Sequence, residues 1–220
     1  MGELFTATRR LLVQELGKWV MRDTFDKAVN YKLYVADAAY EIGRVSDVSR
    51  DGTYVFRIAG SAPGAPDPSG YIRVYRYIPV WKKDVTYVYS MARGVTFDTG
   101  TYLEMLYHQC IGTPYVWGIR FEPKTGKWLY LTTDAEWVEG DFTFTPQQSD
   151  EMIHYGFTVN PQDGKYAALY VRGQRYDIHT LEPCVGSIVI TAANYFSYGL
   201  YLASSSGAKF HFDEVGVAVL

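Results

Sequence analysis

The stretch "KFHFDEVGVAVL" (Lys209–Leu220) decides the fold that we expect for this chain. In an extended strand, successive side chains point to opposite faces. On that rule, the two phenylalanines of the stretch face one side and its valines face the other. The apolar face changes at Asp213–Glu214, which predicts either a β-bulge at this point or a strand that is covered on both faces.

The two carboxylates of this strand, Asp213 and Glu214, allow three explanations: a catalytic pair, a metal site or a structural role. Adjacent residues of a strand point to opposite faces, so these acids do not form the facing pair that a glycosidase needs. A carboxylate in a buried strand has to be hydrogen-bonded or metal-bound to offset its burial. We therefore expect a closing strand of a sandwich, with acids that stabilise the fold.

Alternation of apolar and polar side chains recurs along the chain from Phe25 onward. Such alternation is typical of half-buried strands in antiparallel sheets. The clearest runs are residues 54–58, 71–78, 85–91, 115–121, 153–159, 188–191 and 196–202.

The connections between these runs are those of β-hairpins and surface loops. In "EPKTGK" (Glu122–Lys127) and "NPQDGK" (Asn160–Lys165), a glycine stands where a hairpin turn needs a positive φ. The segment "GSAPGAPDPSG" (Gly60–Gly70) is rich in Pro, Gly and Ser, which indicates a surface loop. No repeat of fixed period occurs, which argues against a propeller or solenoid. The chain therefore predicts roughly ten or more strands in one two-sheet sandwich.

We expect residues 1–21 to form a short N-terminal arm, helical or extended, and residues 22–220 to form a single β-sandwich domain. Apolar residues recur at helical spacing over residues 8–20, but the same stretch also fits a first strand. The apolar stripe of an amphipathic helix usually packs on its own domain. Packing of this stripe on a neighbouring subunit is the alternative.

Composition and charge argue against several classes of protein. The chain has 220 residues and a formal net charge of −3, and its Lys and Arg residues are scattered. Nucleic-acid binding usually needs a clustered basic surface, so we do not expect it. No window reaches the roughly 18 apolar residues of a membrane span, and the N-terminus lacks the apolar core of a signal peptide. We expect synthesis in the cytoplasm, with a place on a virion surface as a hypothesis.

The cysteines and histidines carry no metal-binding signature. Cys110 and Cys184 form neither a CxxC pair nor a Cys/His ligand set. We expect buried free thiols, with a single disulfide as the alternative. The four histidines lie on separate segments, which favours structural roles.

Four segments follow one another in an order that resembles the concanavalin A-like or laminin-G-like jelly-roll superfamily. They are "RDTFDKAVNYKLY" (Arg22–Tyr34), "WGIRFEPKTGKWLYL" (Trp117–Leu131), "HYGFTVNPQDGKYAALYVRGQRYDI" (His154–Ile178) and "YGLYLASSSGAKFHFDEVGVAV" (Tyr198–Val219). The resemblance covers most of residues 22–220 and implies an all-β, two-sheet antiparallel jelly-roll sandwich. It also implies a structural Ca²⁺ as the one candidate cofactor, with Asp213 as the best ligand and Asp26 as its partner.

The superfamily includes enzymes, but this sequence lacks their motifs. Its glucanases carry a Glu-x-Asp-x-x-Glu strand, and no such strand occurs here. Its polysaccharide lyases carry a Gln-x-His strand, whereas "YHQC" (Tyr107–Cys110) has the reverse order. A nucleophile elbow, a P-loop and a metalloprotease motif are absent as well. We therefore expect a protein without catalytic activity.

Ten residues form the candidate ligand-binding face. Aromatic rings stack on the C–H faces of sugars while Arg and Glu bond their hydroxyl groups, and Tyr also suits protein interfaces. The alternative is that these rings belong to the core or form pairs across strands. The candidates are Tyr71, Arg73, Tyr75, Tyr77, Tyr87, Tyr89, Tyr102, Glu104, Tyr115 and Trp117.

Two functions fit these observations. The first is a non-catalytic binding or structural module that docks into a larger multimeric assembly, such as the decoration or tail surface of a virion. It predicts a protein partner or self-assembly. The alternative is a carbohydrate-binding, lectin-like module that acts with a glycan-processing system and takes a glycan ligand. Neither function predicts binding to nucleic acid or to a membrane.

Overall fold

β-Strands account for every regular element in the part of the chain that the computed structural model describes. These residues are 18–25, 31–36, 38–46, 54–61, 69–78, 85–110, 114–185, 194–203 and 206–220. The all-β prediction is confirmed for this part. Within the same ranges, no helix is long and apolar enough to span a membrane.

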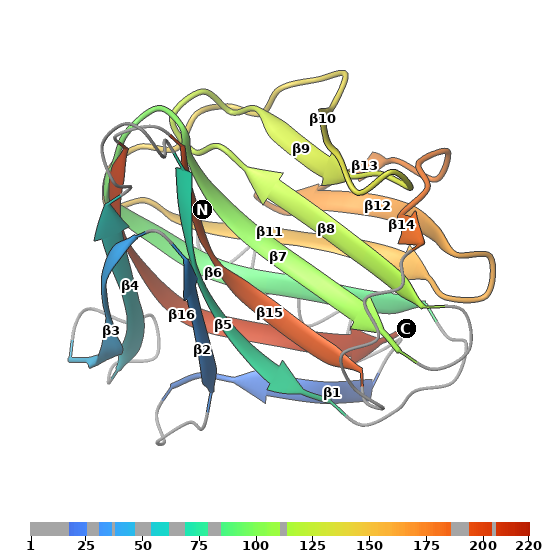
Figure 1. Cartoon of the computed structure of the whole chain (residues 1–220), viewed down its shortest axis with the longest axis horizontal. Helices are drawn as coiled ribbons and strands as arrows, with labels where there is room; N and C mark the ends of the chain where they lie inside the picture. Colours follow the sequence, from blue (N-terminus) through green and yellow to red (C-terminus); the bar gives the residue numbers. More distant parts are fainter. Residues whose placement is uncertain are drawn as a thin grey trace.

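The strands form two antiparallel sheets that pack face to face (Figure 1). Within the described ranges, the first sheet has eight strands in the order β13-β12-β11-β6-β16-β4-β3, and β1 pairs with β16. Its strands are β1 (Lys18–Asp23), β3 (Ala39–Val45), β4 (Val55–Ser61), β6 (Thr86–Phe97), β11 (Met152–Asn160), β12 (Lys165–Val171), β13 (Gln174–Asp177) and β16 (Gly207–Val219). The second sheet also has eight described strands, in the order β10-β9-β8-β7-β15-β5-β2, and β14 pairs with β8. Its strands are β2 (Lys32–Ala36), β5 (Ser69–Tyr77), β7 (Thr101–Gln109), β8 (Tyr115–Phe121), β9 (Trp128–Leu131), β10 (Trp137–Glu139), β14 (Cys184–Val185) and β15 (Tyr195–Ala203).

The strand order is that of a jelly roll. β16, the last strand, lies between β4 and β6, and β15 lies between β5 and β7. Consecutive strands alternate between the sheets at β4 and β5, at β6 and β7, and at β15 and β16. The C-terminal strands therefore complete both sheets, and the predicted two-sheet antiparallel sandwich is confirmed.

Local turns form where the sequence predicts hairpins. Gly164, between β11 and β12, has a φ of 72°, and Gly126, between β8 and β9, has a φ of 77°. A Cβ at Gly126 would lie 1.9 Å from the carbonyl oxygen of Phe144, so both the conformation and the space require glycine there. The predicted strand over residues 188–191 lies outside the described residues.

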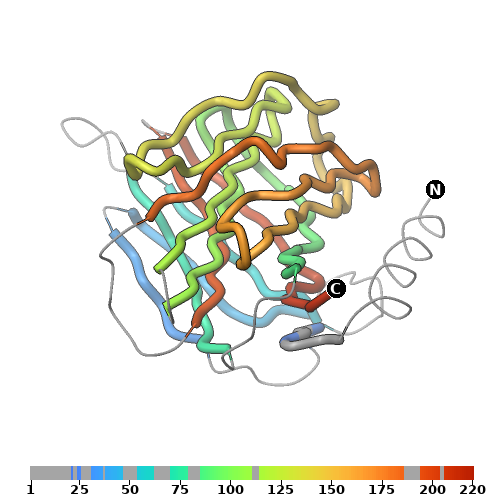
Figure 2. The backbone as a smooth tube through the Cα atoms, turned by 90° about the vertical axis from the view of Figure 1, so that its right-hand side faces the viewer, coloured from blue at the N-terminus to red at the C-terminus, as the bar shows by residue number. Residues whose placement is uncertain are grey.

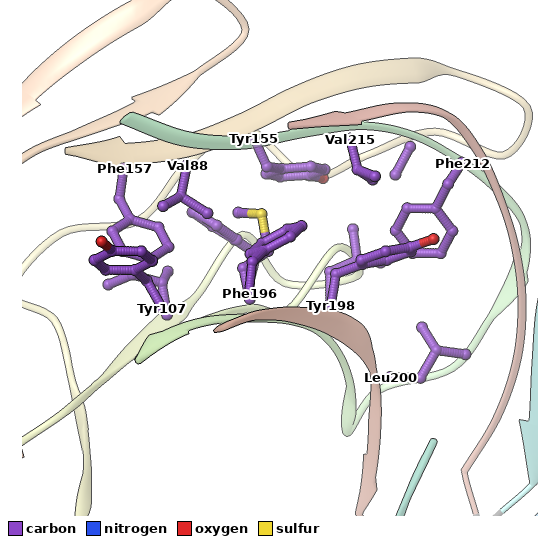
Figure 3. Packing of buried hydrophobic residues seen from close by; sticks show 14 of the residues in the cluster. Val88, Tyr107, Tyr155, Phe157, Phe196, Tyr198, Leu200, Phe212 and Val215 are labelled. Carbon is purple, nitrogen blue, oxygen red and sulfur yellow. The ribbon is translucent and has the colours of Figure 1, made fainter. Parts of the chain in front are cut away.

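The core lies between the sheets and is built from the inward-facing side chains of both. Figure 3 shows Val88 and Phe157 from the first sheet facing Tyr107 and Phe196 from the second. These four side chains are buried almost completely. Burial of one large apolar side chain stabilises the fold by about 1.5–3 kcal/mol. The apolar members of the alternating runs therefore hold the two sheets together.

The β-bulge predicted for the last strand is present. The register of β16 against β6 shifts between Phe212 and Glu214. Phe212 points into the core before the shift, and Val215 points into it afterwards. On the opposite face Ala218 is buried too, so this strand is covered on both sides. The Glu214 carboxylate accepts a hydrogen bond from the Tyr89 hydroxyl, which offsets its burial.

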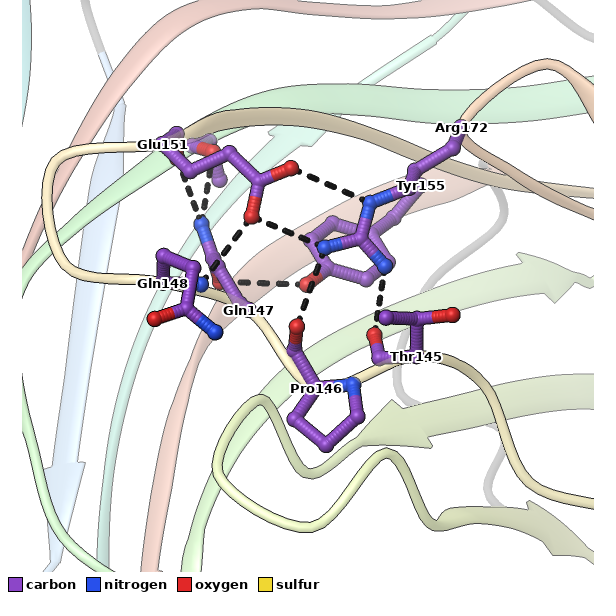
Figure 4. A network of polar contacts seen from close by, with 8 residues as sticks. Thr145, Pro146, Gln147, Gln148, Glu151, Tyr155 and Arg172 are labelled. Carbon is purple, nitrogen blue, oxygen red and sulfur yellow. Dashed lines mark hydrogen bonds and ion pairs between the residues drawn. The ribbon is translucent and has the colours of Figure 1, made fainter.

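Arg172 ties the long connection between β10 and β11 to the first sheet (Figure 4). Its Nε and Nη2 donate to the Glu151 carboxylate at 3.1 and 2.8 Å. The Gln147 side chain donates to the Glu151 carbonyl at 2.7 Å and accepts from the Tyr155 hydroxyl at 3.1 Å. Charge-assisted pairs of this bidentate kind are among the stronger hydrogen bonds in proteins. Glu151 therefore stabilises the fold.

Strand β1 begins within the predicted N-terminal arm. Residues 1–17, and with them most of the predicted helix, lie outside the described residues. Residues 18–23 pair with β16, so the first strand begins before the expected boundary at residue 22. The backbone N–H of Leu220 donates to the Val85 carbonyl at 2.8 Å, which places the C-terminus beside the start of β6 (Figure 2).

Candidate ligand-binding face

The outward-facing side chains of the second sheet form one aromatic surface with a charged centre, which we call the tyrosine face. On β5, Ile72 and Val74 point into the core, so the residues between them point outward. The same alternation orients the side chains of β7, β8 and β15. The face comprises Tyr34, Tyr71, Arg73, Tyr75, Tyr77, Tyr102, Glu104, His108, Arg120, Trp137, Tyr195 and Tyr201.

Arg73, Glu104 and Arg120 form a charged row at the centre of this face. The strand register places Arg73 opposite Gly199, Gly199 opposite Glu104, and Glu104 opposite Arg120. Arg73 donates through Nε to Glu104 Oε1 and through Nη2 to Oε2, the latter at 3.1 Å. Arg120 Nε donates to Glu104 Oε2 at 2.9 Å. One carboxylate therefore binds two guanidinium groups.

Gly199 allows Arg73 to reach Glu104 across β15. Paired strands lie about 4.8 Å apart, so the backbones of β5 and β7 are separated by about 10 Å. A Cβ at Gly199 would lie 1.9 Å from the carbonyl oxygen of Ile72 on β5. Because this position has no side chain, the guanidinium can pass over the middle strand.

All three groups of the charged row are ionised near neutral pH. Burial alone would raise the pKa of Glu104, which is 1% exposed, but the attraction of Arg73 and Arg120 outweighs it and lowers the pKa. Burial lowers the pKa of Arg120, and Glu104 offsets part of this effect. Burial also acts to lower the pKa of Arg73, but Glu104 raises it overall. The carboxylate therefore holds the two arginines in place as charged groups.

Aromatic rings enclose both guanidinium groups. The Cζ atom of Arg120 lies 3.6 Å from the ring centre of Tyr201 and 3.9 Å from that of Trp137. The Cζ atom of Arg73 lies 4.4 Å from the ring centre of Tyr71. A guanidinium over an aromatic face is attracted by the ring quadrupole. The rings therefore fix the arginines from outside, as Glu104 fixes them from within.

Tyrosines flank the charged row on both sides. On one side, Tyr71, Tyr201 and Tyr102 occupy facing positions on β5, β15 and β7. On the other side, Tyr77 lies at the end of β5. Tyr34 is 51% exposed and Tyr77 is 38% exposed, whereas Tyr71, Tyr102 and Tyr201 are half-buried. The tyrosine face thus offers accessible ring surface at its margin and charge at its centre.

His108 and Tyr195 form a stacked pair beside the charged row. Their ring centres are 3.8 Å apart and the ring planes differ by 17°. Burial, together with the positive charge of Arg73, lowers the pKa of His108 to about 3. Burial also raises the pKa of Tyr195. Both groups are therefore neutral at physiological pH.

The structure brings some of the sequence-predicted ligand residues together and separates the others. Tyr87 and Tyr89 lie on β6 of the first sheet, where their buried rings stack at 5.5 Å. Trp117 points into the core, and Tyr115 packs half-buried against the core on the same side of β8. Those that share the tyrosine face are Tyr71, Arg73, Tyr75, Tyr77, Tyr102 and Glu104.

Several residues of the face were not among the sequence-predicted set. Arg120 lies three residues after Trp117 on β8, so the two side chains point to opposite faces of the sheet. Because Trp117 is buried in the core, Arg120 points outward. Tyr195 and Tyr201 alternate in the same way with core residues of β15. An isolated glycine inside a strand, as at Gly199, signals a close approach by another group. Gly199 lies between Arg73 and Glu104 in the strand register, so this glycine could have indicated where the charged row crosses β15.

Only one of the two proposed calcium ligands, Asp213, lies among the described residues. Asp213 is buried at the β-bulge, and Asp26 lies outside the described residues. Over the described ranges, no group of three or more His, Cys, Asp or Glu side chains could hold a metal ion. Cys110 and Cys184 are free thiols, the second of them buried.

The chain is similar in structure to several carbohydrate-active proteins. No protein-family model matches the chain, and no curated protein matches it in sequence. An endo-β-1,4-glucuronan lyase from the fungus Trichoderma reesei is 11% identical, with a TM-score of 0.65, and the match covers 92% of this chain and 96% of the lyase. A carbohydrate esterase from a Shiga toxin-encoding bacteriophage is 10% identical, with a TM-score of 0.58 over 92% of this chain and 99% of the esterase.

An endo-β-1,3-glucanase from Pyrococcus furiosus is 15% identical, with a TM-score of 0.52 over 92% of this chain and 94% of the glucanase. At these identities the similarity shows the fold. The chain has the concanavalin A-like jelly-roll sandwich that the sequence resemblance implied.

Proposed function

We propose that this concanavalin A-like sandwich is a non-catalytic carbohydrate-binding module whose ligand lies across the tyrosine face. The observation that carries the proposal is the charged row of Arg73, Glu104 and Arg120 between flanking tyrosines. Carbohydrate sites combine aromatic surface with a few well-placed polar groups. The tyrosine face has both on one sheet.

The rings and the charged row have separate roles in this proposal. Tyrosine presents an apolar ring and a polar hydroxyl at low entropic cost, so it can pack on the C–H face of a sugar. The tyrosines at the margin, Tyr34 and Tyr77, are the most exposed of the face. They provide stacking surface, while the arginines donate hydrogen bonds to the polar groups of the sugar.

Similar solved structures support a carbohydrate ligand. The lyase, the esterase and the glucanase described above are all named for carbohydrate substrates, and each matches more than nine-tenths of this chain. This chain shares their fold, and its tyrosine face brings charged and aromatic groups together on one sheet.

The environment of Glu104 supports a role in binding rather than in glycoside hydrolysis. Both of its carboxylate oxygens accept hydrogen bonds from arginines, and its pKa is lowered. A general acid for glycoside hydrolysis needs a raised pKa and a free oxygen. Glu104 therefore acts as an internal counter-ion that positions Arg73 and Arg120.

The test is a glycan array followed by calorimetry on the best ligand. Tyr77→Ala and Tyr34→Ala remove exposed rings from the tyrosine face and are expected to weaken binding by about tenfold or more, since stacked rings are typical hot spots. Tyr40→Ala is the matched control, because Tyr40 is 52% exposed but lies on β3 of the first sheet. The proposal is refuted if all three variants weaken glycan binding equally, or if no glycan on the array binds the chain.

A second candidate function is docking into a multimeric assembly such as a virion. It is supported by the bacteriophage esterase that shares the fold and by an exposed tyrosine on one edge strand of each sheet, Tyr34 on β2 and Tyr40 on β3. Edge strands are common sites of association between chains. Light scattering on the purified chain tests this candidate: a multimer that Tyr34→Lys and Tyr40→Lys dissociate supports docking, and a strict monomer that binds glycan argues against it.

A further inference from the structure

We propose that the ligand of the tyrosine face is an acidic glycan, a polymer of hexuronate sugars, and that Arg73 and Arg120 bind its carboxylate groups. This inference rests on the proposed function, because it assumes that the face binds carbohydrate. It names the chemical class of the sugar.

The first argument is the charge of the row. Two guanidinium groups face one carboxylate, so the row carries one positive charge in excess. Glu104 is almost completely buried, whereas the Arg73 side chain is 24% exposed. The Arg120 side chain is 7% exposed and lies against Tyr201 and Trp137, so the positive charge that a ligand meets first is that of Arg73.

The second argument is the number of hydrogen-bond donors that the row leaves unused. A guanidinium has five N–H donors and no acceptor. Arg120 uses only Nε on Glu104, and its two terminal nitrogens have no acceptor within the described part of the chain. Arg73 uses Nε and Nη2, and Nη1 has no acceptor there either. Arg73 is partly exposed and Arg120 is buried, and the unused donors of both match an oxygen-rich anion that reaches the row between the rings.

The third argument is that nearby acids are already engaged. The charges of Glu122 and Glu139 both act to raise the pKa of Tyr102, which flanks the charged row, so these two acids lie close to the tyrosine face. Glu122 accepts from the Gly100 N–H at 2.6 Å and from the Thr125 hydroxyl at 2.5 Å. Glu139 pairs with Lys127 at 3.0 Å. Glu139 is paired with a cation and Glu122 is held by two neutral donors, and neither acid forms an ion pair with Arg73 or Arg120 within the described residues.

The fourth argument is a further cation at the margin. The Lys32 ammonium group on β2 lies 4.6 Å from the ring centre of Tyr77. Lys32 is exposed, and its partner on β5 is Tyr75. A polymer that crosses the sheet from the charged row to this edge meets positive charge at both places, with aromatic rings between them.

The chemistry of the donors favours a carboxylate on a sugar. The guanidinium fork matches the planar geometry of a carboxylate and binds it through two parallel hydrogen bonds. The flanking tyrosines suit the apolar faces of a pyranose ring. A hexuronate combines both features in one residue, so each repeat can place its ring on a tyrosine and its carboxylate on an arginine.

The test uses affinity electrophoresis and calorimetry with polygalacturonate, alginate and β-glucuronan, and with the same polymers after their carboxyl groups have been reduced to alcohols. We expect the reduced polymers to bind at least about tenfold more weakly, the loss of one charge-assisted pair. Binding to the uronate should also weaken at high salt. Equal binding to both forms would overturn this inference and leave carbohydrate binding intact. Binding to neutral glucans alone would also overturn the inference of an acidic ligand and leave carbohydrate binding intact. If no glycan binds, both the acidic ligand and carbohydrate binding are overturned.

Two variants add an independent check. Lys32→Ala removes an exposed cation from the face and is expected to weaken uronate binding a few-fold without a change in the melting temperature. Arg120→Lys keeps the charge but removes the fork, and is expected to weaken binding at least about fivefold, since Lys cannot bind a carboxylate through two parallel bonds. Arg175→Ala is the matched control, because Arg175 is an exposed cation on β13 of the first sheet. An effect of Arg175→Ala equal to that of Lys32→Ala would contradict the proposed site.

Discussion

Arg73 on β5 binds both carboxylate oxygens of Glu104 on β7, across the intervening strand β15. This pair organises the centre of the second sheet, because Arg120 binds the same carboxylate from the other side. The arrangement needs a strand without a side chain at Gly199, rings that cover the guanidinium groups, and a carboxylate that remains ionised under burial.

Gly199→Ala tests the steric part of this arrangement. Its Cβ would lie 1.9 Å from the Ile72 carbonyl oxygen, and overpacking of this kind costs about 1–3 kcal/mol of unfolding free energy. Gly43→Ala on β3 is the control, because no heavy atom lies within 4 Å of its added Cβ. Urea denaturation should show a clearly lower free energy of unfolding for Gly199→Ala and little change for Gly43→Ala. Equal stabilities would contradict the close packing.

Glu104→Gln tests the electrostatic part. Removal of one partner from a buried ion pair leaves uncompensated charge, so we expect a loss of about 3–5 kcal/mol in the free energy of unfolding. Glu139→Gln removes the partner of Lys127 in an exposed pair, and such pairs contribute about 0–1 kcal/mol. If chemical denaturation shows the same small decrease in the free energy of unfolding for Glu104→Gln and Glu139→Gln, the charged row does not hold the sheet together.

His108 makes the fold sensitive to acid. Burial holds its pKa at about 3, against 6.5 for a free histidine, so between these values the unfolded chain binds more protons than the folded one. The contribution of His108 to the free energy of unfolding is therefore fully present above about pH 6.5 and falls as the pH falls toward 3, by up to about 1.4 kcal/mol per pH unit.

His108→Gln should flatten this dependence, as measured by urea denaturation from pH 7 down to about pH 4. His179→Gln, a change at an exposed histidine after β13, should leave the slope unaltered. An unchanged slope in His108→Gln would mean that His108 is not the neutral buried group that its environment indicates.

Tyr89→Phe tests the structural role of the acid at the β-bulge. The Tyr89 hydroxyl donates to the buried Glu214 carboxylate, and loss of a donor to a buried charged acceptor costs about 1–3 kcal/mol. Tyr40→Phe, at an exposed position, is expected to be neutral. Thermal unfolding measures both. A neutral Tyr89→Phe would show that Glu214 does not depend on this hydrogen bond.

Much of the fold follows from the sequence because strand alternation is a local property. The bulge at Asp213–Glu214 was predictable, since the apolar face changes there and only an extra residue or double coverage can accommodate it. The turn at Gly126 was predictable for the same kind of reason.

The candidate site was only partly predictable, because alternation does not tell which strands become neighbours. Tyr71 and Tyr87 belong to similar runs, but β5 and β6 enter different sheets. Nothing in the local pattern places Glu104 between Arg73 and Arg120, since these residues are brought together by the pairing of β15 with β5 and β7 and of β7 with β8.

The most direct measurement for the central proposal is a chemical-shift titration of the labelled chain with the best glycan from the array. Carbohydrate binding at the tyrosine face predicts that the largest shifts fall on outward residues of the second sheet, such as Tyr77, Tyr201 and the indole of Trp137. Shifts concentrated on the first sheet, around Tyr40, or the absence of any saturable shift, would contradict it.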